Sequence, residues 1–398
     1  MNRLLPIVFA GFLAAPAFAA PTLDAAKLKL ASANVVVLDA DQGKAIYAKA
    51  ADEVTPIASL TKLMTGYLVF DALRAKKVTL DQKLPVSVRA WKMPGSRMFI
   101  DPKMQVSVDD LLSGMIIQSG NDATMALAEG VGGTAEQFVK MMNDQAAAMG
   151  LKGSAYKNPE GLTEPGHTTT ARDLAVITAH LQHDFPQYMH YYSTKQYRYP
   201  GTPASNSNNR NLLLYRDPSV DGLKTGYTEA AGYCMIVTAK RDFPNLVQAG
   251  APAGSAAAAG SRRLLSIVLG STSENARANE SQKLLNWGYT AYEAIKLFDA
   301  NQAVVTPAVW KGKAPTVKLG QVHSLIVAVP AGSATKIKTQ VSRTDPLVAP
   351  FNKGQQLGVL KVTLDDQPLV DVPLLALEAV EQAGVFGRAW DAMRLWIK

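Results

Sequence analysis

Three short strings along the chain combine a hydroxyl group with an amine, an amide or a flexible backbone. In chain order they are Ser59-Leu60-Thr61-Lys62, Ser119-Gly120-Asn121 and Lys224-Thr225-Gly226. A serine hydroxyl is a weak nucleophile until a base takes its proton, and a lysine whose pKa is lowered by burial or by nearby positive charge can be that base. Ser59 and Lys62 lie three residues apart, so they share one face of a helix. The strings predict a serine acyl-transfer site that needs no histidine.

The residues around Ser59 favour this chemistry. Ser59 is predicted to open an apolar helix that extends to about Ala75, so its backbone N–H lies at the positive helix end, where a developing oxyanion is stabilised. Lys62 stands in the otherwise apolar stretch 60–64, a setting that lowers the pKa of a lysine if its side chain is buried. A single S-x-x-K pattern is weak by itself, because Ser and Lys are common on helix surfaces.

The other two strings also have plain structural interpretations. Ser119-Gly120-Asn121 is predicted in a loop between two helices, where Ser119 can pass a proton to a leaving amine and Asn121 can hold Lys62 and the substrate amide. Taken alone, a turn with an N-cap explains this tripeptide better. Lys224-Thr225-Gly226 precedes a predicted strand, and the missing side chain of Gly226 leaves room for an extended peptide; a surface turn is the alternative.

A helical block between two sets of strands is the predicted framework of the site. The stretches 34–39 and 44–48 flank the turn residues 41–43 and predict a hairpin. Helices are predicted at 59–75, 108–118, 134–149, 171–182 and 273–298, and strands at 232–239 and 263–270, with an exposed loop at 251–260. Because strands occur at both ends of the block, we expect an α+β domain with helices packed on one antiparallel sheet.

From about Asp299 the pattern changes. The runs 324–329, 336–341 and 358–364 alternate or are β-branched, which predicts a small all-β domain over residues 299–383. A spacer or scaffold is its favoured role, and binding of a partner protein is the alternative. In the tail, 384–398, apolar residues that include Trp390 share one helical side, which predicts an amphipathic helix in the plane of a membrane. A helix docked on the β domain is the other possibility.

The first residues predict an exported protein. Arg3, the apolar run 4–15 and Ala17-Phe18-Ala19 are typical of a secretory signal over residues 1–19, which leaves a catalytic domain over residues 20–298. Cys234 is the only cysteine, so no intramolecular disulfide is possible. No other segment is apolar for long enough to span a bilayer.

Charge and histidine content exclude other functions. The formal net charge of +8 fits ordinary solubility or attraction to an anionic membrane surface or an acidic wall polymer. No cluster of basic and aromatic residues accompanies it, so nucleic acid is not an expected partner. The five histidines form no H-E-x-x-H pattern, and neither a metal nor another cofactor is expected. The G-x-S-x-G elbow of histidine-dependent serine hydrolases is also missing.

The three strings and their flanking words resemble those of the D-alanyl-D-alanine carboxypeptidases among the low-molecular-weight penicillin-binding proteins. The set S-x-x-K, S-x-N and K-T-G is shared with class A β-lactamases, but the longer words are more specific. They are the stretches 57–65, 118–123, 209–211, 221–228 and 263–266. The resemblance covers essentially the whole mature chain, including the small β domain and the tail.

The resemblance implies a role for each residue of a proton path. Ser59 is the nucleophile and Lys62 its general base, while Ser119 and Asn121 complete the path. The backbone N–H groups of Ser59 and Tyr227 form the oxyanion hole. Thr124 and Glu160 stand where some members of the family carry Cys and His, so the chain departs from those members here.

The resemblance also implies how a terminal carboxylate is bound. Lys224 and Thr225, with Gly226 in the same motif, engage the carboxylate of the substrate. Arg210 and Arg263 match two arginines that hold that carboxylate or order the site.

The implied fold is a β-lactamase/transpeptidase-like catalytic domain of antiparallel sheet and helices, followed by a small all-β domain and an amphipathic C-terminal helix. The implied activity is that of a serine-type D-Ala-D-Ala carboxypeptidase, which removes the terminal D-alanine from pentapeptide stems of peptidoglycan through an acyl-enzyme on Ser59. Penicillin and other β-lactam antibiotics acylate the same serine. The expected location is the periplasmic face of the inner membrane, as a peripheral protein. No oligomeric state is predicted.

Two alternatives remain open. The first alternative keeps the serine acyl transfer and makes the protein a β-lactamase or an endopeptidase that cuts cross-links. The chain lacks a Glu-x-x-Leu-Asn string of the kind that positions the deacylating water in class A β-lactamases. The second alternative is a protein without catalytic activity, a scaffold that binds the cell wall or determines cell shape.

Overall fold

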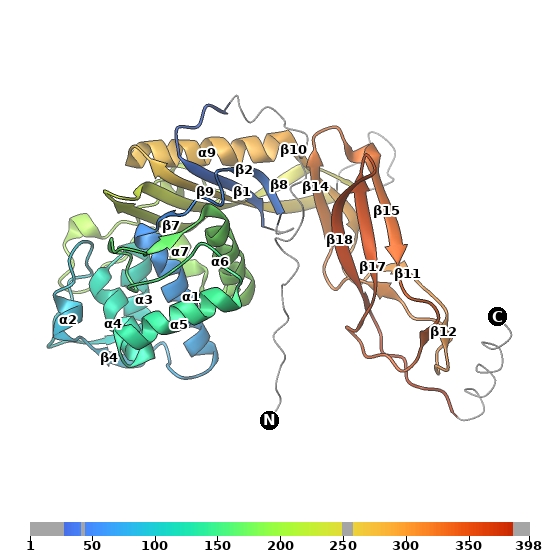
Figure 1. The fold of residues 1–398 in the computed structure, drawn as a ribbon, viewed down its shortest axis with the longest axis horizontal. Coiled ribbons are helices and arrows are strands. Elements are labelled where there is room, and N and C mark those ends of the chain that lie inside the picture. The colour runs from blue at the N-terminus through green and yellow to red at the C-terminus, as the bar shows by residue number, and fades with distance from the viewer. Residues whose placement is uncertain (1–27, 41–43, 249–257, 385–398) are drawn as a thin grey trace. The chain divides into compact units, whose positions relative to one another are not determined.

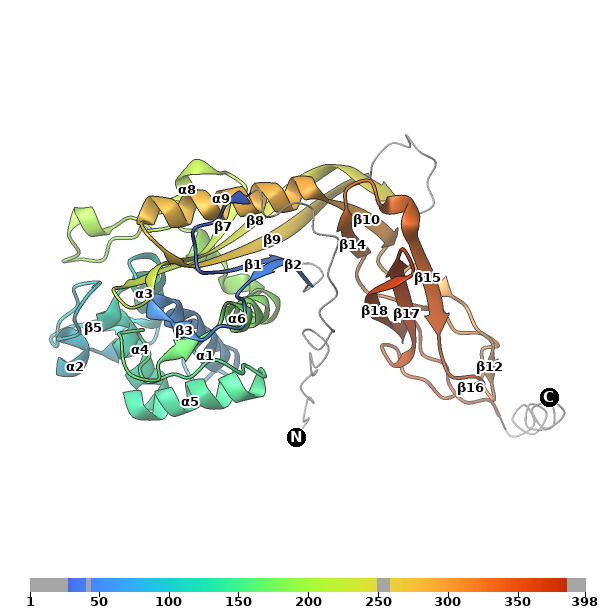
Figure 2. The ribbon, with the colours of Figure 1, turned by 45° about the horizontal axis from the view of Figure 1, so that its top comes forward.

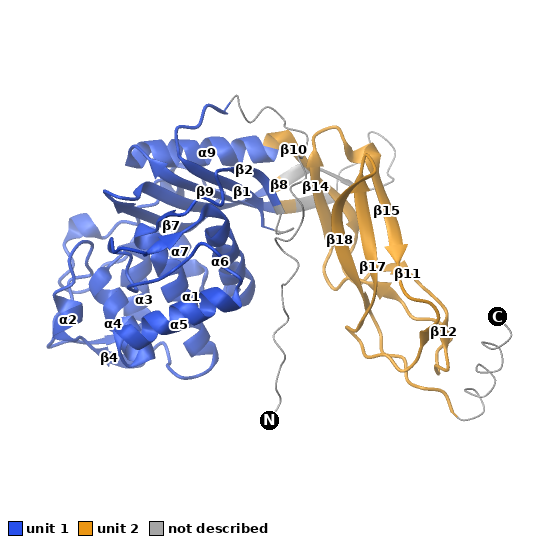
Figure 3. Ribbon diagram, in the orientation of Figure 1, with its two compact units in different colours: residues 1–241, 262–289 blue, residues 242–261, 290–398 orange. Residues whose placement is uncertain are grey.

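The computed structural model of the chain describes residues 28–40, 44–248 and 258–384. The predicted signal peptide lies outside these residues, as does the predicted C-terminal helix apart from Gly384. The chain divides into two compact units (Figure 3): unit 1 is Met1–Arg241 with Arg262–Tyr289, and unit 2 is Asp242–Ser261 with Thr290–Lys398. Unit 2 thus begins before Asp299, the predicted start of the small β domain.

The sheet of unit 1 is assembled from both ends of the unit. Its strands are β1 (Asn34–Asp39), β2 (Lys44–Lys49), β7 (Val220–Thr228), β8 (Gly232–Gln248) and β9 (Ala258–Ser271). β1 lies antiparallel between β2 and β9, and β8 joins β9 to β7, with which it is antiparallel. The predicted hairpin and the sheet drawn from distant segments are therefore confirmed. β9 already begins at Ala258, inside the stretch predicted as a loop.

Helices cover both faces of this sheet (Figures 1 and 2). On one side lie η2 (Ala58–Thr61), α1 (Lys62–Arg74), α3 (Val108–Ile117), α4 (Asn121–Gly132), α5 (Ala135–Ala148) and α6 (Ala171–Asp184), and on the other lies α9 (Glu274–Ala291). The shorter helices are α2 (Val88–Trp91), α7 (His190–Ser193) and α8 (Leu213–Arg216). α1 is buried on every side from Lys62 to Phe70, because neighbouring helices surround it. The residue that opens α1 is thereby removed from water.

Local capping explains why the predicted helices formed where they did. The hydroxyls of Ser107, Thr134 and Thr170 accept hydrogen bonds from the backbone N–H three residues on and so begin α3, α5 and α6. The helix predicted to reach Phe298 is wrong at its end: α9 stops at Ala291, and β10 (Tyr292–Phe298) follows. β10 pairs antiparallel with β14 (Leu325–Pro330), and this long-range pairing outweighs the helical pattern of the segment.

Unit 2 has its own sheets and core. One sheet has the order β11 (Ala303–Val305), β13 (Leu319–Gly320), β18 (Gln367–Ala376), β17 (Gln356–Leu364) and β15 (Ile337–Ser342). A short parallel pair joins β12 (Val309–Trp310) to β16 (Leu347–Val348). β14, β15 and β17 confirm the three predicted strands. None of the helices in the described part of the chain is long and apolar enough to cross a membrane.

Candidate active site

Ser59 lies in a tight turn that precedes α1. The turn is the 3₁₀ segment η2, and α1 starts only at Lys62, so the expectation that Ser59 opens the α-helix is corrected by one turn. Ala58 has a φ of +51°, a left-handed conformation that prevents the helix from extending backward. Thr61 donates through Oγ1 to the Ala58 carbonyl at 2.7 Å and lies 2.7 Å from His167 Nε2. These bonds fix the turn that presents Ser59.

His167 supports the turn as a neutral ring. Its Nδ1 accepts a hydrogen bond from the Lys157 N–H at 2.9 Å, so the ring proton belongs on Nε2, from where it is donated to Thr61. Burial lowers the pKa of His167 to about 4, which keeps the ring uncharged at neutral pH. His167 therefore positions the nucleophile's turn and is not the base that activates Ser59.

Lys62 meets three acceptors in a buried pocket. Its Nζ lies 3.1 Å from Ser59 Oγ, 2.7 Å from Asn121 Oδ1 and 2.6 Å from the carbonyl oxygen of Glu160. A neutral amine has two hydrogens, which the two carbonyl oxygens use, so its lone pair is left to accept the Ser59 hydroxyl proton. Burial, with a smaller contribution from the charge of Arg210, lowers the pKa of Lys62 to about 7. Lys62 thus has both the geometry and the proton affinity of a general base.

The second string brings another hydroxyl to a second lysine. Ser119 and Gly120 form the turn between α3 and α4, and Asn121 is the first residue of α4, a helix that the sequence analysis did not predict. Ser119 has a φ of +61° and accepts a hydrogen bond through Oγ from Lys224 Nζ at 2.9 Å. Burial, and then the charge of Lys62, lowers the pKa of Lys224. The strings therefore form two hydroxyl and amine pairs, and Asn121, two residues after Ser119, binds the lysine of the other pair.

The third string lies within β7 itself rather than ahead of a strand. A β-carbon added to Gly226 would lie 3.2 Å from Ser59 N and 3.2 Å from Ala58 Cβ, so glycine allows the strand to approach the nucleophile's turn. This close approach, rather than room for a peptide, is the requirement at Gly226. Thr225 is buried, whereas the Tyr227 side chain is half exposed and packs on Tyr233 with 4.3 Å between ring centroids. The backbone after Gly226 thus lies beside the Ser59 N–H.

Of the two predicted arginines, the structure places one beside these residues. Arg210 donates to Ser96 Oγ at 2.8 Å, and its charge acts on both Lys62 and Lys224. Arg263 lies in β9 and forms an ion pair with Asp221 at 2.6 Å. Asp221 lies at the opposite end of β7 from Tyr227, so Arg263 is not beside these residues.

Arg277 is the arginine that sequence reasoning missed. It lies in the first turn of α9, is 3% exposed, and donates to the Gly226 carbonyl at 3.0 Å. It also pairs with Glu274 at 2.9 Å, and its charge, like that of Arg210, lowers the pKa of Lys224. No spacing motif marks Arg277 in the sequence, because α9 reaches the site only through the folding of the sheet.

Asp122 is a second residue that sequence reasoning left without a role. Its buried carboxylate accepts hydrogen bonds from the backbone N–H groups of Met98, Phe99 and Ile100, at 2.8, 2.8 and 3.3 Å. The segment held in this way continues from Pro94, whose carbonyl accepts from Asn121 Nδ2 at 2.6 Å. Asp122 therefore fixes one wall of the site.

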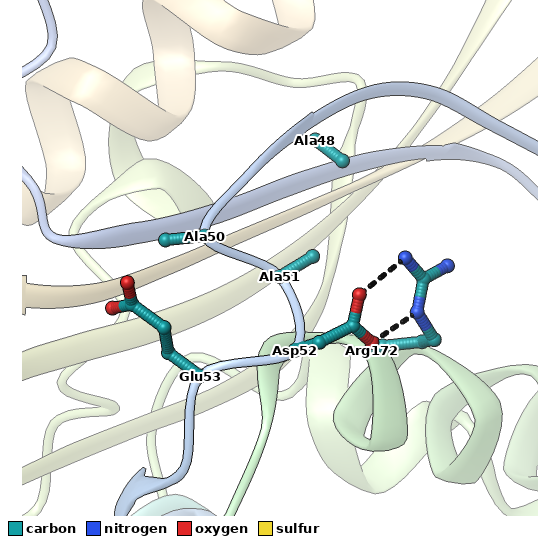
Figure 4. Close-up of a pocket in the computed structure, with 6 residues that line it drawn as sticks. All are labelled: Ala48, Ala50, Ala51, Asp52, Glu53 and Arg172. Carbon is teal, nitrogen blue, oxygen red and sulfur yellow. Dashed lines mark hydrogen bonds and ion pairs between the residues drawn. The ribbon is translucent and has the colours of Figure 1, made fainter. Parts of the chain in front are cut away.

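Two hollows among the described residues of unit 1 differ in their relation to Ser59. A hollow of about 480 Å³, seen in Figure 4, is lined by Ala48, Ala50, Ala51, Asp52, Glu53 and Arg172, and Arg172 is paired with Asp52 there. Its lining offers no hydroxyl, thiol or amine nucleophile. The other, of about 300 Å³, is lined by residues that include Ala58, Gly161, Glu164 and Thr228, which places it beside the nucleophile's turn and the end of β7.

The fold and the paired hydroxyls and lysines fit a serine hydrolase in which a lysine lies in position to act as a base. Residues 21–250 match the family described as D-alanyl-D-alanine carboxypeptidase, and residues 292–382 match the C-terminal domain of penicillin-binding protein 5. The chain belongs to the D-alanyl-D-alanine carboxypeptidase family. It has the α+β fold of penicillin-binding proteins with a C-terminal β-rich domain.

Individual relatives extend the similarity over most of the chain. D-alanyl-D-alanine carboxypeptidase DacC of Escherichia coli strain K12 is 37% identical over 384 residues, which cover 94% of this chain and 91% of the relative. Penicillin-binding protein 5 from Haemophilus influenzae is 32% identical, with a TM-score of 0.76 over 89% of this chain and 98% of that one. Penicillin-binding protein D2 from Listeria monocytogenes, solved in an ampicillin-bound form, is 31% identical, with a TM-score of 0.55 over 65% of this chain and 96% of that one.

Proposed function

We propose that this chain is a serine-type D-Ala-D-Ala carboxypeptidase that removes the terminal D-alanine from pentapeptide stems of peptidoglycan. The observation that carries the proposal is the 3.1 Å separation of Ser59 Oγ from Lys62 Nζ in a buried site of this family's fold. β-Lactams acylate the same serine, because they present a strained amide where the peptide presents its scissile bond.

The reaction begins with proton transfer from Ser59 to Lys62. The Ser59 Oγ attacks the carbonyl carbon of the penultimate D-alanine while Lys62 takes the hydroxyl proton. The negative oxygen of the tetrahedral intermediate accepts from the N–H groups of Ser59 and Tyr227, which the packing of Gly226 on Ser59 brings together. The intermediate then collapses, the C–N bond breaks, and an acyl-enzyme remains.

Ser119 completes the proton path. Its Oγ accepts from Lys224 and lies in the turn next to Asn121, which binds Lys62. The leaving D-alanine nitrogen takes a proton from this hydroxyl. The proton that Lys62 took from Ser59 then replaces the one that Ser119 gave up, so Lys62 is again a neutral amine. Water then attacks the acyl-enzyme with Lys62 again as base, which releases the shortened stem and regenerates Ser59.

Selection of a chain end follows from the positive charge around β7. Lys224, Arg210 and Arg277 act on one another electrostatically and lie along the end of β7 that carries Thr225. A free carboxylate offsets this crowding of like charges, whereas an internal peptide bond does not. The site therefore favours a terminal D-alanine, and a carboxypeptidase is favoured over an endopeptidase or a non-catalytic scaffold. We infer that Arg277, rather than Arg263, supplies the second arginine that the family resemblance implies for this carboxylate.

Replacement of the nucleophile tests the proposal. Fluorescent penicillin is expected to label the purified protein and the Ser59→Ala variant is expected to take up no label, because no other hydroxyl lies beside Lys62 Nζ in the described residues. Release of D-alanine from a pentapeptide should be lost in parallel. Ser207→Ala, which alters an exposed hydroxyl, is the matched control and should behave as the natural protein. Undiminished labelling of Ser59→Ala would sink the assignment.

The location is also part of the proposal. The signal-like residues 1–19 support export, and the amphipathic pattern of residues 384–398 supports peripheral attachment at the periplasmic face of the inner membrane. Deletion of residues 384–398 is expected to move the protein from the membrane fraction to the soluble fraction, since the apolar side of the tail supplies the attachment. Fractionation of cells that express each form measures this. Continued membrane association of the shortened chain would contradict the tail as anchor.

A further inference from the structure

The smaller hollow on unit 1 is formed by the nucleophile's turn, the end of β7 and the loop that follows Glu160. It measures about 300 Å³, and its lining is residues 56–58, residues 161–168 and Thr228. Ile57 and Ala58 are buried, whereas residues 163–166 are exposed. The lining of the hollow therefore combines an apolar wall, which suits an aliphatic group, with a rim that solvent reaches.

The order of groups along β7 gives the direction in which a bound stem peptide runs. In the proposed function, the positive charges near Thr225 bind the terminal carboxylate, and the Tyr227 N–H binds the oxygen of the carbonyl that Ser59 attacks. A peptide that follows the strand from its carboxylate through the scissile bond therefore reaches Thr228, the last residue of β7, next. Thr228 lines the hollow, so the side chain that precedes the two D-alanines lies at its mouth.

A tight turn holds Glu164 at the rim of the hollow. The Glu164 carbonyl accepts from the His167 N–H at 3.0 Å, and Pro165 and Gly166, whose φ is +77°, lie between them. This is the sequence and backbone of a type II turn. Asn158 Nδ2 also donates to Glu164 Oε2 at 3.2 Å. His167 is buried and anchors the turn, whereas Glu164 is exposed, so its carboxylate is accessible to a ligand.

The carboxylate of Glu164 is the charge that a ligand of the hollow meets. Of the lining residues that the structure describes, Glu164 alone is charged at neutral pH, because burial lowers the pKa of His167 to about 4. Glu160, the other acidic residue nearby in the loop, is buried, and its backbone carbonyl binds Lys62. The opposing charge is Lys157, whose Nζ lies 3.9 Å from the β-carbon that Gly166 would carry. A cationic ligand thus gains from Glu164 and loses part of that gain to Lys157.

We propose that this hollow binds the side chain that precedes the two D-alanines of the stem, and that Glu164 selects a side chain that ends in an ammonium group. The inference rests on the proposed carboxypeptidase function and narrows its substrate. The aliphatic part of the side chain packs on Ile57 and Ala58, and the ammonium donates a charge-assisted hydrogen bond to the Glu164 carboxylate. A side chain with a neutral end does not form this ion pair. Glu164 is therefore a specificity-determining residue.

Two peptides that differ at one group test the selection. The first is Nα-acetyl-L-lysyl-D-alanyl-D-alanine with a free ε-amine, and the second has that amine acetylated. The natural protein should release D-alanine from the first with a kcat/KM about threefold higher, the scale of an accessible ion pair. In Glu164→Gln the two values should coincide, near that of the acetylated peptide. In the natural protein, about 1 M salt should also remove most of the preference, because it screens accessible charges.

Two further variants separate this role from a merely structural one. Glu229→Gln removes an exposed carboxylate just after Thr228 that is not among the lining residues, so this matched control should keep the preference. Lys157→Met should increase the preference, because the opposing cation is removed. If Glu164 only stabilised its loop, Glu164→Gln would slow the cleavage of both peptides and leave their ratio unchanged.

The outcomes distinguish this inference from the proposed function. If the natural protein cleaves both peptides with equal kcat/KM, or if the preference persists in Glu164→Gln, selection by Glu164 is refuted and the carboxypeptidase function stands. If neither peptide is cleaved, the proposed function fails, and binding of the two peptides to Ser59→Ala decides the inference. Tighter binding of the free amine that is lost when Glu164→Gln is added supports the site, and equal binding refutes it.

Discussion

Replacement of Lys62 by methionine is expected to lower the rate of acylation by penicillin by about two orders of magnitude or more, the usual contribution of a general base. Methionine has a similar length and no charge, so it fills the pocket at the start of α1 without a base or a buried cation. Ser59 stays in its turn, because the bonds that hold this turn come from Thr61 and His167. The loss therefore measures proton transfer and not misfolding.

The acylation rate is also expected to fall as the pH is lowered. Lys62 must be uncharged to take the Ser59 proton, and burial places its pKa at about 7. In the natural protein the acylation rate should fall about tenfold for each pH unit below that value, as the fraction of neutral amine falls. This decrease in rate at low pH should be absent in Lys62→Met, because the variant has no amine at position 62 that could be protonated.

Stopped-flow measurement with a chromogenic β-lactam checks both parts. Lys157→Met, which removes an exposed lysine near His167, is the matched control and should keep the natural rate and limb. An unchanged acylation rate in Lys62→Met would exclude Lys62 as the base. Circular dichroism of the variant should match that of the natural protein.

The parts of this fold that the sequence predicted are those with local causes. Capping hydroxyls at Ser107 and Thr134 act on N–H groups three residues away, so both helix starts are encoded within one turn of chain. The Val-rich run of β1 beside its turn residues, and the alternating or β-branched runs of β14, β15 and β17, likewise predicted strands from local sequence. The end of α9 was mispredicted because the conformation of Tyr292–Phe298 is decided by pairing with β14, whose partner residues lie 27 to 38 positions further along the chain.

The site divides in the same way. Ser59 and Lys62 are neighbours in sequence, and their pairing follows from one helical turn. Arg277, in contrast, reaches the Gly226 carbonyl across 51 residues of chain, so only the assembled sheet reveals it. The burial of Glu160 is equally invisible in sequence, where a glutamate before a glycine suggests an exposed turn. The pairing of residues that are close in sequence could be predicted. The charged residues that shift the pKa values of the site lysines come from distant segments and could not.

Gly161→Ala is the second substitution with a large expected effect, because Gly161 lies against the backbone that carries the nucleophile. A β-carbon at this position would lie 1.9 Å from the Ala58 carbonyl oxygen and 2.9 Å from Ser59 N. The residue also has a φ of +92°, which disfavours any side chain. Either the loop or the turn must move. We expect a loss of unfolding free energy and, in the protein that still folds, about a hundredfold slower acylation, the scale of a 1 Å misplacement at a reacting group.

Gly150→Ala is the control that separates the steric clash of an added β-carbon from the cost of placing alanine at a positive φ. Gly150 has a φ of +72°, but nothing lies within 4 Å of the β-carbon that alanine would add, so this control should lose only about 1–2 kcal/mol, the cost of a left-handed alanine. Gly161→Ala should lose at least about 2 kcal/mol more, as overpacked sites do. Chemical denaturation measures both. Equal losses would mean that the loop moves freely away from Ala58, and the close approach of Gly161 would then place no constraint on the turn that carries Ser59.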